Sequence, residues 1–377
     1  GALALDANTT GASNTAVGVQ ALSAATTASN NVAIGKAAGE NLTTGSTNVI
    51  VGASAMDAAT TAAENVAVGY QALNKTTTGH SNVALGYQAM YNTGTGVSEA
   101  IAIGRLAQRK STADNNISIG YFAHYDLTSG GTNIAIGNSA GANQTTGNNN
   151  VCIGYDAGGD MTVSSGNVFV GKSAGDNVSG AFSNFNTALG HEALSGFSNT
   201  GGANTALGCQ AGDNITTGSN NTCVGNEADA SSATVSNEIT LGNSSVTSFR
   251  IPGLQSGAST GHVLTYNSTN GNITLEAPSI PQNSQTSAYT LVAADAGKHV
   301  SITTGGVTVP SGVFSIGDVV SVYNNSGSDQ TITQGSSVTL REAGTGNTGN
   351  RTLGQYGLAT VLCVGSNEFV ISGAGVS

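Results

Sequence analysis

A five-residue motif, Asn-x-Ala-(Val/Ile/Leu)-Gly, recurs fourteen times between residues 14 and 242, and most copies are seventeen residues apart. The closing glycines are Gly18, Gly35, Gly52, Gly69, Gly86, Gly104, Gly120, Gly137, Gly154, Gly171, Gly190, Gly208, Gly225 and Gly242. We number each repeat from this glycine: Asn occupies position −4 in twelve copies and Ala occupies position +3 in thirteen. One such repeat cannot bury an apolar face alone, so it must stack on its neighbours.

The repeats predict an all-β fold, with a β-solenoid or β-roll shaft of about fourteen 17-residue coils over residues 14–247. Positions −3 and −1 are mostly Val, Ile or Leu, an alternation that indicates a short strand. A second half-turn, Gly-x-x-Ala followed by Leu, Met or Gly, leads to a polar corner that is often Thr-Thr-Gly. We therefore expect about two short strands and two turns in each coil.

The asparagine and glycine of each motif are predicted to have structural roles. Stacked asparagines form ladders in which each side-chain amide bonds to the next layer, and glycine adopts backbone angles that other residues avoid. Examples are Asn31 with Gly35, Asn133 with Gly137 and Asn150 with Gly154.

The composition argues against several functions. Only 8% of the residues are charged, against about 25% in an ordinary globular domain. The net charge is −11, which disfavours nucleic acid as a partner. The chain has no run of eighteen apolar residues, so we expect no membrane insertion. Cys152 and Cys223 replace Ala at position −2, which suggests small buried side chains rather than a disulfide or metal site.

The thin core of such a coil predicts a homotrimer of parallel rods. Few apolar side chains are available in each turn, and the Leu, Met and Ala of the second half-turn, including Leu73, Met90 and Leu194, offer a strip that identical chains can bury. A monomeric solenoid that is stable alone is the alternative.

The motif with its Thr-Thr-Gly corners resembles the repeats of bacteriophage tail fibres and the head repeats of bacterial trimeric autotransporter adhesins. The resemblance covers residues 14 to about 242. It implies a trimeric, left-handed β-roll that works as a stalk or adhesive surface. It also implies a virion, outside the cell, as the location, with virion tail or baseplate proteins as partners; a bacterial cell surface is the alternative.

The rest of the chain is not repetitive. Residues 1–13 are a lead-in, and residues 248–283 form a neck and linker with an expected β-hairpin from 262–266 and 272–275, a turn at 267–271 and prolines at 278 and 281. Residues 284–377 are predicted to form a small β-sandwich tip. Its candidate strands are 289–292, 299–302, 319–323, 331–333, 359–364 and 369–371. This segment resembles the C-terminal tips of phage tail fibres.

Two groups of residues are candidates for recognition. Around the long loops of the tip these are Tyr323, Arg341, Arg351 and Tyr356, since loops on a rigid scaffold often bind partners. At position +1 of the shaft repeats these are Tyr70, Tyr87, Tyr121 and Tyr155. The shaft tyrosines would contact glycans or, alternatively, serve as plates that pack coils or chains together.

The sequence gives little support for catalysis. The five histidines are scattered, and none belongs to a motif with catalytic or metal-ligand spacing. We therefore expect no enzymatic activity, no bound metal and no cofactor. Asp156, Asp160, Asp176, Glu192 and Asp213 are the carboxylates that could pair across coils in a glycan-cleaving tailspike. The expected function is a non-enzymatic virion fibre whose tip binds a host-surface receptor, glycan or protein. A bacterial trimeric adhesin head and a glycan-cleaving tailspike are the alternatives.

Overall fold

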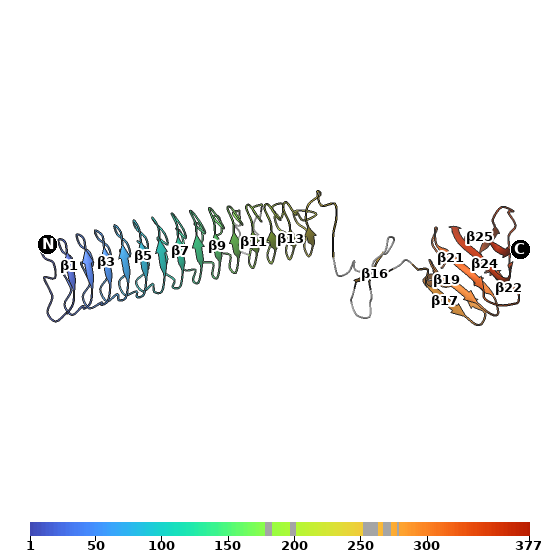
Figure 1. Ribbon diagram of the computed structural model, residues 1–377, viewed down its shortest axis with the longest axis horizontal. Helices are drawn as coiled ribbons and strands as arrows, with labels where there is room; N and C mark the ends of the chain where they lie inside the picture. The colour runs from blue at the N-terminus through green and yellow to red at the C-terminus, as the bar shows by residue number, and fades with distance from the viewer. Residues whose placement is uncertain (178–182, 197–200, 252–262, 267–272, 277–278) are drawn as a thin grey trace. The chain divides into compact units, whose positions relative to one another are not determined.

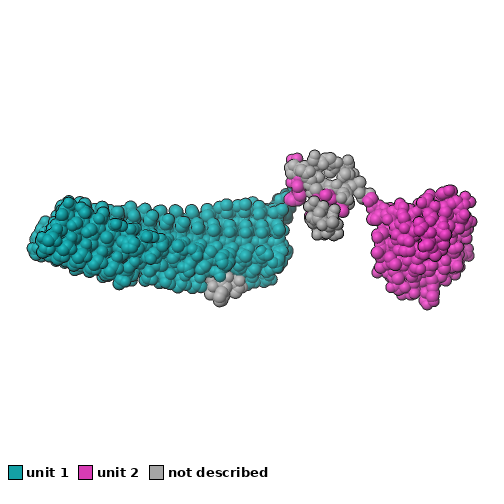
Figure 2. Space-filling model, turned by 90° about the horizontal axis from the view of Figure 1, so that it is seen from below, with its two compact units in different colours: residues 1–248 teal, residues 249–377 magenta. Residues whose placement is uncertain are grey.

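The computed structural model describes residues 1–377 except 178–182, 197–200, 252–262, 267–272 and 277–278. The chain divides into two compact units, residues 1–248 and residues 249–377 (Figure 2). Each unit is described by itself.

Unit 1 is a β-solenoid, as the repeats predict. Each coil contributes one three-residue strand, and the fourteen strands pair in parallel, each with the next in the chain (Figure 1). The strands are β1 (Thr15–Val17), β2 (Val32–Ile34), β3 (Val49–Val51), β4 (Val66–Val68), β5 (Val83–Leu85), β6 (Ile101–Ile103), β7 (Ile117–Ile119), β8 (Ile134–Ile136), β9 (Val151–Ile153), β10 (Val168–Val170), β11 (Thr187–Leu189), β12 (Thr205–Leu207), β13 (Thr222–Val224) and β14 (Ile239–Leu241). The lead-in also bonds to this stack, since Leu5 N donates to Ala21 O at 3.1 Å.

The expectation of a second strand in each coil is wrong. The second half-turn is a run of turns in which positions +2 and +4 have left-handed backbones, as in Gln71 (φ 54°) and Leu73 (φ 53°). These alternating conformations point successive peptide groups up and down the stack. Gln71 N donates to Ala53 O of the preceding coil, at 3.0 Å, and Leu73 N donates to Ala89 O of the next coil, at 2.9 Å. The coil therefore keeps its backbone bonds to both neighbours without an extended strand.

The second half-turn supplies the core of the single chain. Leu73, Met90 and Leu194 at position +4 are fully buried inside the solenoid, together with the Ala residues at positions −2 and +3. The prediction that these side chains form a strip buried against identical chains is therefore wrong. Their left-handed backbone at +4 aims them into the coil rather than away from it.

Positions +4 and +7 share the interior volume of each coil. In most coils with a large +4 residue the +7 residue is small, as in Leu73 with Thr76 and Met90 with Thr93; His124 with Leu127 is an exception. Where +4 is glycine, +7 is large, and the neighbouring side chains leave no room for another atom. A Cβ at Gly39 would lie 2.8 Å from Ile50 Cδ1 and 3.0 Å from Leu22 Cδ2. Close packing of this kind keeps the interior filled. Gly141 with Gln144, Gly158 with Met161 and Gly212 with Ile215 are further pairs of this kind.

The asparagines form a buried ladder along the shaft. Asn133 Oδ1 accepts hydrogen bonds from the backbone N and the Nδ2 of Asn150, at 2.9 and 3.2 Å, and its own Nδ2 donates to Gly147 O at 2.9 Å. Asn31 Oδ1 accepts in the same way from Asn48, at 2.9 and 3.0 Å. Each asparagine thus satisfies backbone groups that would otherwise be unpaired at the corner of its coil.

A polar layer interrupts the apolar core near its middle. Gln108, Ser118, His124 and Gln144 occupy inward positions and are fully buried. Ser118 Oγ lies 2.9 Å from His124 Nδ1 and 3.2 Å from Gln108 Oε1, and Gln144 Nε2 donates to Gly147 O at 2.7 Å. One hydrophobic cluster extends from Ala21 to Ala107 and the next begins at Ala123.

The outer face of the strands is apolar. Positions −3 and −1 point away from the core, and Val17, Ile34, Val49, Leu189 and Leu207 are all exposed, the last two by 46% and 44%. We call these two rows the outer strip, which is aliphatic except where Thr holds position −3 in β1, β11, β12 and β13. The single chain covers the strip only in part: both rows are half-buried from β4 to β9 and more exposed in several of the other strands.

Unit 2 begins with an antiparallel hairpin, β15 (Val263–Tyr266) and β16 (Ile273–Glu276). The predicted turn at 267–271 and Pro278 of the predicted linker lie outside the described residues. The hairpin itself confirms the two strand segments expected in the neck.

The remainder of unit 2 is one nine-stranded sheet that curls around a single apolar core. Its strands are β17 (Gln282–Gln285), β18 (Tyr289–Thr290), β19 (His299–Ile302), β20 (Val307–Val309), β21 (Val319–Asn324), β22 (Gln330–Gln334), β23 (Thr339–Glu342), β24 (Arg351–Gly365) and β25 (Glu368–Val376), with a short 3-10 helix at Ala293–Asp295.

Successive strands of this sheet alternate between two rows. β17, β19 and β21 pair in parallel, and so do β18, β20 and β22. The long strand β24 then pairs antiparallel with β21, β22 and β25 and so joins the rows. The six predicted strands are present, whereas 282–285, 307–309 and 339–342 were not predicted, because segments of three or four residues carry a weak strand signal.

Candidate functional site

The tyrosines at position +1 form a stacked column on the shaft. The rings of Tyr70 and Tyr87 stack with their centroids 5.5 Å apart and a 19° angle between their planes. The next coil places Arg105 at this position, and its guanidinium carbon lies 5.6 Å from the Tyr87 ring and 5.5 Å from the Tyr121 ring. Three of the four predicted shaft tyrosines therefore belong to one column, with an arginine inserted between two of them.

A second column at position +5 lies beside the first. Arg109 is placed between Tyr91 and Tyr125, at 5.9 and 5.4 Å from the ring centroids, and donates from Nη1 to Tyr125 Oη at 3.0 Å. Phe122 joins the two columns, since its ring lies 4.0 Å from that of Tyr121 and 4.6 Å from that of Tyr125. We call these two columns with Phe122 and Lys110 the aromatic–cation patch.

The stacking limits which shaft residues can contact a sugar by a ring face. The Tyr87 face toward Tyr70 and the face toward Arg105 are both occupied, so the column favours the alternative role of packing between coils. Tyr155 is 53% exposed and lies outside this column, because Asn138 occupies position +1 between it and Tyr121. Sequence reasoning missed the cations, although their spacing at +1 and +5 of consecutive repeats is the signal that places them.

In unit 2, Tyr323 and Tyr356 lie at the same end of the sheet. Tyr323 on β21 pairs with Leu358 on β24, and its ring stacks on His299 at 5.9 Å. Tyr356 is 63% exposed, has a left-handed backbone (φ 55°), and donates from its backbone N to Ser326 O at 3.3 Å. The two tyrosines thus flank the loop that follows β21, which makes this end a candidate contact surface.

The two arginines lie near the other long loop and differ in exposure. Arg341 on β23 is exposed. Arg351, at the start of β24, is buried: its Nη1 donates to Asn350 O at 2.8 Å and its Nε lies 3.8 Å from Glu342 Oε2. Burial removes Arg351 from the exposed receptor contacts expected at this loop, and it leaves Arg351 with a role inside the domain. The four tip candidates therefore do not form one site.

The predicted carboxylates gather in two groups on the shaft. Asp156 and Asp176 both lie over Gly159, where a Cβ would be 2.4 and 3.0 Å from their respective Oδ1 atoms. Burial, and then the charges of Asp156 and Asp160, raise the pKa of Asp176 to about 6. Burial and Asp160 likewise raise the pKa of Asp156.

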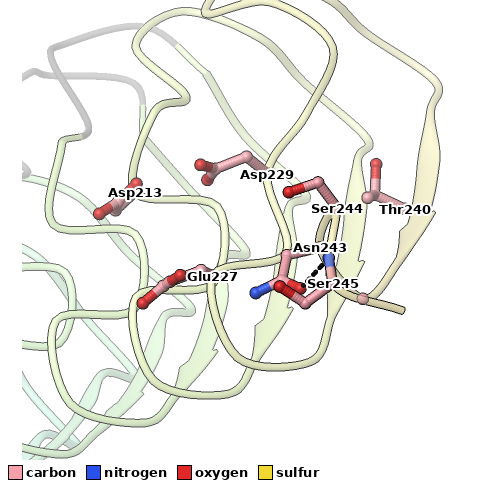
Figure 3. Close-up of a pocket in the computed structure, with 8 residues that line it drawn as sticks. Asp213, Glu227, Asp229, Thr240, Asn243, Ser244 and Ser245 are labelled. Carbon is pink, nitrogen blue, oxygen red and sulfur yellow. Dashed lines mark hydrogen bonds between the residues drawn. The ribbon is translucent and has the colours of Figure 1, made fainter. Parts of the chain in front are cut away.

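The second acidic group lines a recess at the last coil. Asp213, Glu227 and Asp229 surround it with Thr240 and the segment 242–245 (Figure 3). Burial, followed by the charge of Asp229, raises the pKa of Asp213. Glu192 contributes to the same shift and accepts a hydrogen bond from Gln210 Nε2 at 3.0 Å. Desolvation and mutual repulsion thus raise the pKa of Asp156 and Asp176 in the first group and of Asp213 in the second.

Over the described part of the chain, no group of three or more His, Cys, Asp and Glu side chains is arranged to hold a metal ion. The described residues also contain no helix of the length and hydropathy needed to span a bilayer. Comparison of the chain with known protein families, with curated proteins and with solved structures finds no match.

Proposed function

We propose that the protein is a non-enzymatic fibre subunit that forms a homotrimer and presents unit 2 to a receptor, glycan or protein, on a host cell. The outer strip is the observation that carries this proposal. It runs along a fourteen-stranded parallel sheet, and apolar surface of such extent marks an interaction site on a soluble protein. The resemblance to phage tail fibres supports a virion location and virion tail or baseplate proteins as further partners.

Three parallel copies would bury the outer strip of each coil against the same coil of its neighbours. Each chain already fills its own core, so association adds the outer strip rather than completing the solenoid. A rod with three tips also gains avidity, because three weak contacts made together hold more strongly than one.

The first test concerns the strip. The intact particle is expected to have three times the 37.0 kDa mass of one chain. Replacing Leu189 and Leu207 together with Lys should reduce the mass to that of a single chain, because the interface would have to bury six unpaired charges. Light scattering coupled to size exclusion measures this mass.

The matched control is the double variant of His191 and Cys209 to Lys. These exposed residues lie at position +1 of the same two coils, two residues beyond the strip. The control should keep the trimer mass, and circular dichroism should show that both variants remain folded. A wild-type particle with the mass of one chain would contradict the homotrimer, and dissociation of the control would contradict the choice of face.

The second test concerns the tip. Full-length protein is expected to bind host cells, whereas residues 1–248 alone should lose most of this binding in the same cell-pelleting assay. Tyr356→Ser should weaken cell binding severalfold, since it removes the exposed ring beside the Ser326 loop. Ile316→Ser is the control, because Ile316 is 74% exposed and lies near Cys363, at the opposite part of β24.

Undiminished cell binding by residues 1–248 would move recognition to the shaft. Degradation of host polysaccharide by the intact particle would instead favour the glycan-cleaving alternative, with the Asp156 and Asp176 pair as its carboxylates.

A further inference from the structure

The charges of the shaft are divided unevenly along its length. Residues 70–112 contain four of the ten Lys and Arg residues and a single acid, Glu99. Residues 156–238 contain eight Asp and Glu residues and one Lys. On a chain of net charge −11, the first segment is therefore a local basic region, and it coincides with the aromatic–cation patch.

Only one of the three cations in the patch is free. Lys110 pairs with Asp126, and Arg109 is bonded to the Tyr125 hydroxyl. Arg105 is exposed, and no acceptor for its guanidinium lies among the described residues. The rings of Tyr87 and Tyr121 flank its guanidinium on either side.

This sandwich fixes how Arg105 can bind a ligand. The rings of Tyr87 and Tyr121 lie 5.6 and 5.5 Å from the guanidinium carbon, and the N–H groups of Arg105 have no acceptor among the described residues. A guanidinium edge matches the two oxygens of a carboxylate or sulfate. The exposed rings of Tyr87 and Tyr121 also place phenol hydroxyls in adjacent coils, one on each side. The arrangement presents a short row of hydrogen-bond donors with one positive charge at its centre.

We propose that this patch binds an acidic polysaccharide, with Arg105 contacting a carboxylate or sulfate and the flanking tyrosines contacting neighbouring hydroxyls. The inference rests on the proposed attachment function and names a ligand class for the shaft. One free guanidinium suits a polymer that carries widely spaced charges. Nucleic acid, with one charge per about 1.7 Å of duplex, would require several free cations. Neutral sugars would need an open ring face, and both faces of Tyr87 are occupied.

The test measures binding of the intact particle to immobilised hyaluronan, with neutral dextran as the reference polymer. Wild type should bind hyaluronan and not dextran, and the binding should weaken as the salt concentration rises, because the contact is ionic. Arg105→Gln should reduce the affinity about tenfold, and Arg105→Lys should lie between, because an ammonium keeps the charge and loses the planar fork.

Lys36→Gln is the matched control, since Lys36 is an exposed cation at position +1 of a coil outside the patch. It should bind like wild type, and thermal unfolding should show that the Arg105 variants are folded. Absence of hyaluronan binding by wild type, an unchanged affinity in Arg105→Gln, or an equal loss in Lys36→Gln would each overturn the proposal.

Two further readings separate this proposal from others. Salt-sensitive aggregates of the particle that disappear in Arg105→Gln would assign the patch to the acidic coils of a second copy, and would overturn the saccharide proposal. The trimer mass and the tip-dependent cell binding of Arg105→Gln should match wild type. Trimer mass and cell binding therefore test the fibre proposal, whereas hyaluronan binding tests the saccharide proposal.

Discussion

Replacing Gly137 with Ala is expected to lower the free energy of unfolding of the shaft by at least about 3 kcal/mol. Gly137 has φ 140°, a region that residues with a Cβ rarely adopt. A Cβ there would lie 2.2 Å from the carbonyl oxygen of Gly154 and 2.6 Å from its carbonyl carbon. Both atoms belong to the backbone of the next coil, which the parallel pairing of β8 and β9 holds in place. Backbone strain and steric overlap with the next coil therefore both destabilise the variant.

Gly131→Ala is the matched control, because it adds the same methyl group in the preceding coil without either problem. The nearest atom to a Cβ at Gly131 is 3.5 Å away, and its backbone is not left-handed. This variant should change the free energy of unfolding by less than about 1 kcal/mol. Chemical denaturation of residues 1–248 followed by circular dichroism measures both. Equal stability of the two variants would contradict this prediction, because it would mean that neighbouring coils can move apart to accommodate a Cβ at Gly137.

The solenoid could be predicted because three repeat positions have the same structural role in nearly every coil: two serve the backbone and one, Ala at +3, is a small core residue. The Asn at −4, the Gly and the Ala at +3 recur for reasons independent of what the particular coil contacts. Asn133 and Gly137 illustrate this, since one satisfies corner groups and the other permits close approach of the next coil. Residues with these structural roles therefore recur at a fixed spacing in the sequence.

The direction of the side chains could not be predicted from alternation alone. A strand with Val or Ile on one face and Ala on the other can turn either face inward. Here Ala faces inward, because the second half-turn supplies Leu73 and Met90 to the core. The exchange of bulk between +4 and +7, as in Gly158 with Met161, was the signal that these positions share an interior.

The candidate binding residues also divide into those whose position follows from the repeat period and those whose position does not. Tyr70, Tyr87 and Tyr121 hold the same repeat position in nearby coils, so their alignment follows from the period. Arg351 illustrates the opposite case. Its burial depends on the antiparallel pairing of β24 with β22, in which Arg351 lies opposite Ile332, a contact between separate strands that no local pattern encodes.

Acidification from pH 6.5 to pH 3 is expected to destabilise the shaft through His124. Burial lowers the pKa of His124 to about 3, against 6.5 for an unperturbed histidine. Below pH 6.5 the unfolded chain therefore takes up a proton that the folded chain excludes, and the stability contributed by the neutral ring is lost as the pH falls. The difference of about 3.5 pH units corresponds to at most about 5 kcal/mol.

The polar layer explains why the folded shaft resists this proton. A protonated ring carries hydrogen on both nitrogens, whereas Nε2 of the buried His124 has no hydrogen-bond partner among the described residues. The charge would also lie in the core, beside the amides of Gln108 and Gln144 and with no carboxylate among the groups that shift its pKa. Neither amide can neutralise a positive charge, so protonation should open the solenoid at this layer.

The measurement is the melting temperature of residues 1–248 at a series of pH values, compared with that of His124→Leu. The comparison is necessary because Asp176 acts in the opposite sense: its folded pKa of about 6 exceeds the ordinary 3.8, so acidification between these values favours the folded state. Leucine occupies the same +4 position with nearly the same backbone at Leu73. The variant should therefore lose the acid-induced decline and keep the opposing contribution of Asp176.

His80→Gln provides the control, since His80 is exposed and outside the polar layer. It should follow wild type at every pH. Parallel curves for wild type and His124→Leu would mean that His124 gains its proton without cost to the fold, which requires water or a counter-ion at the layer. A steeper acid decline in wild type would instead establish the layer as the weakest point of the shaft under acid, because the core on each side of it consists of apolar side chains that do not titrate in this range.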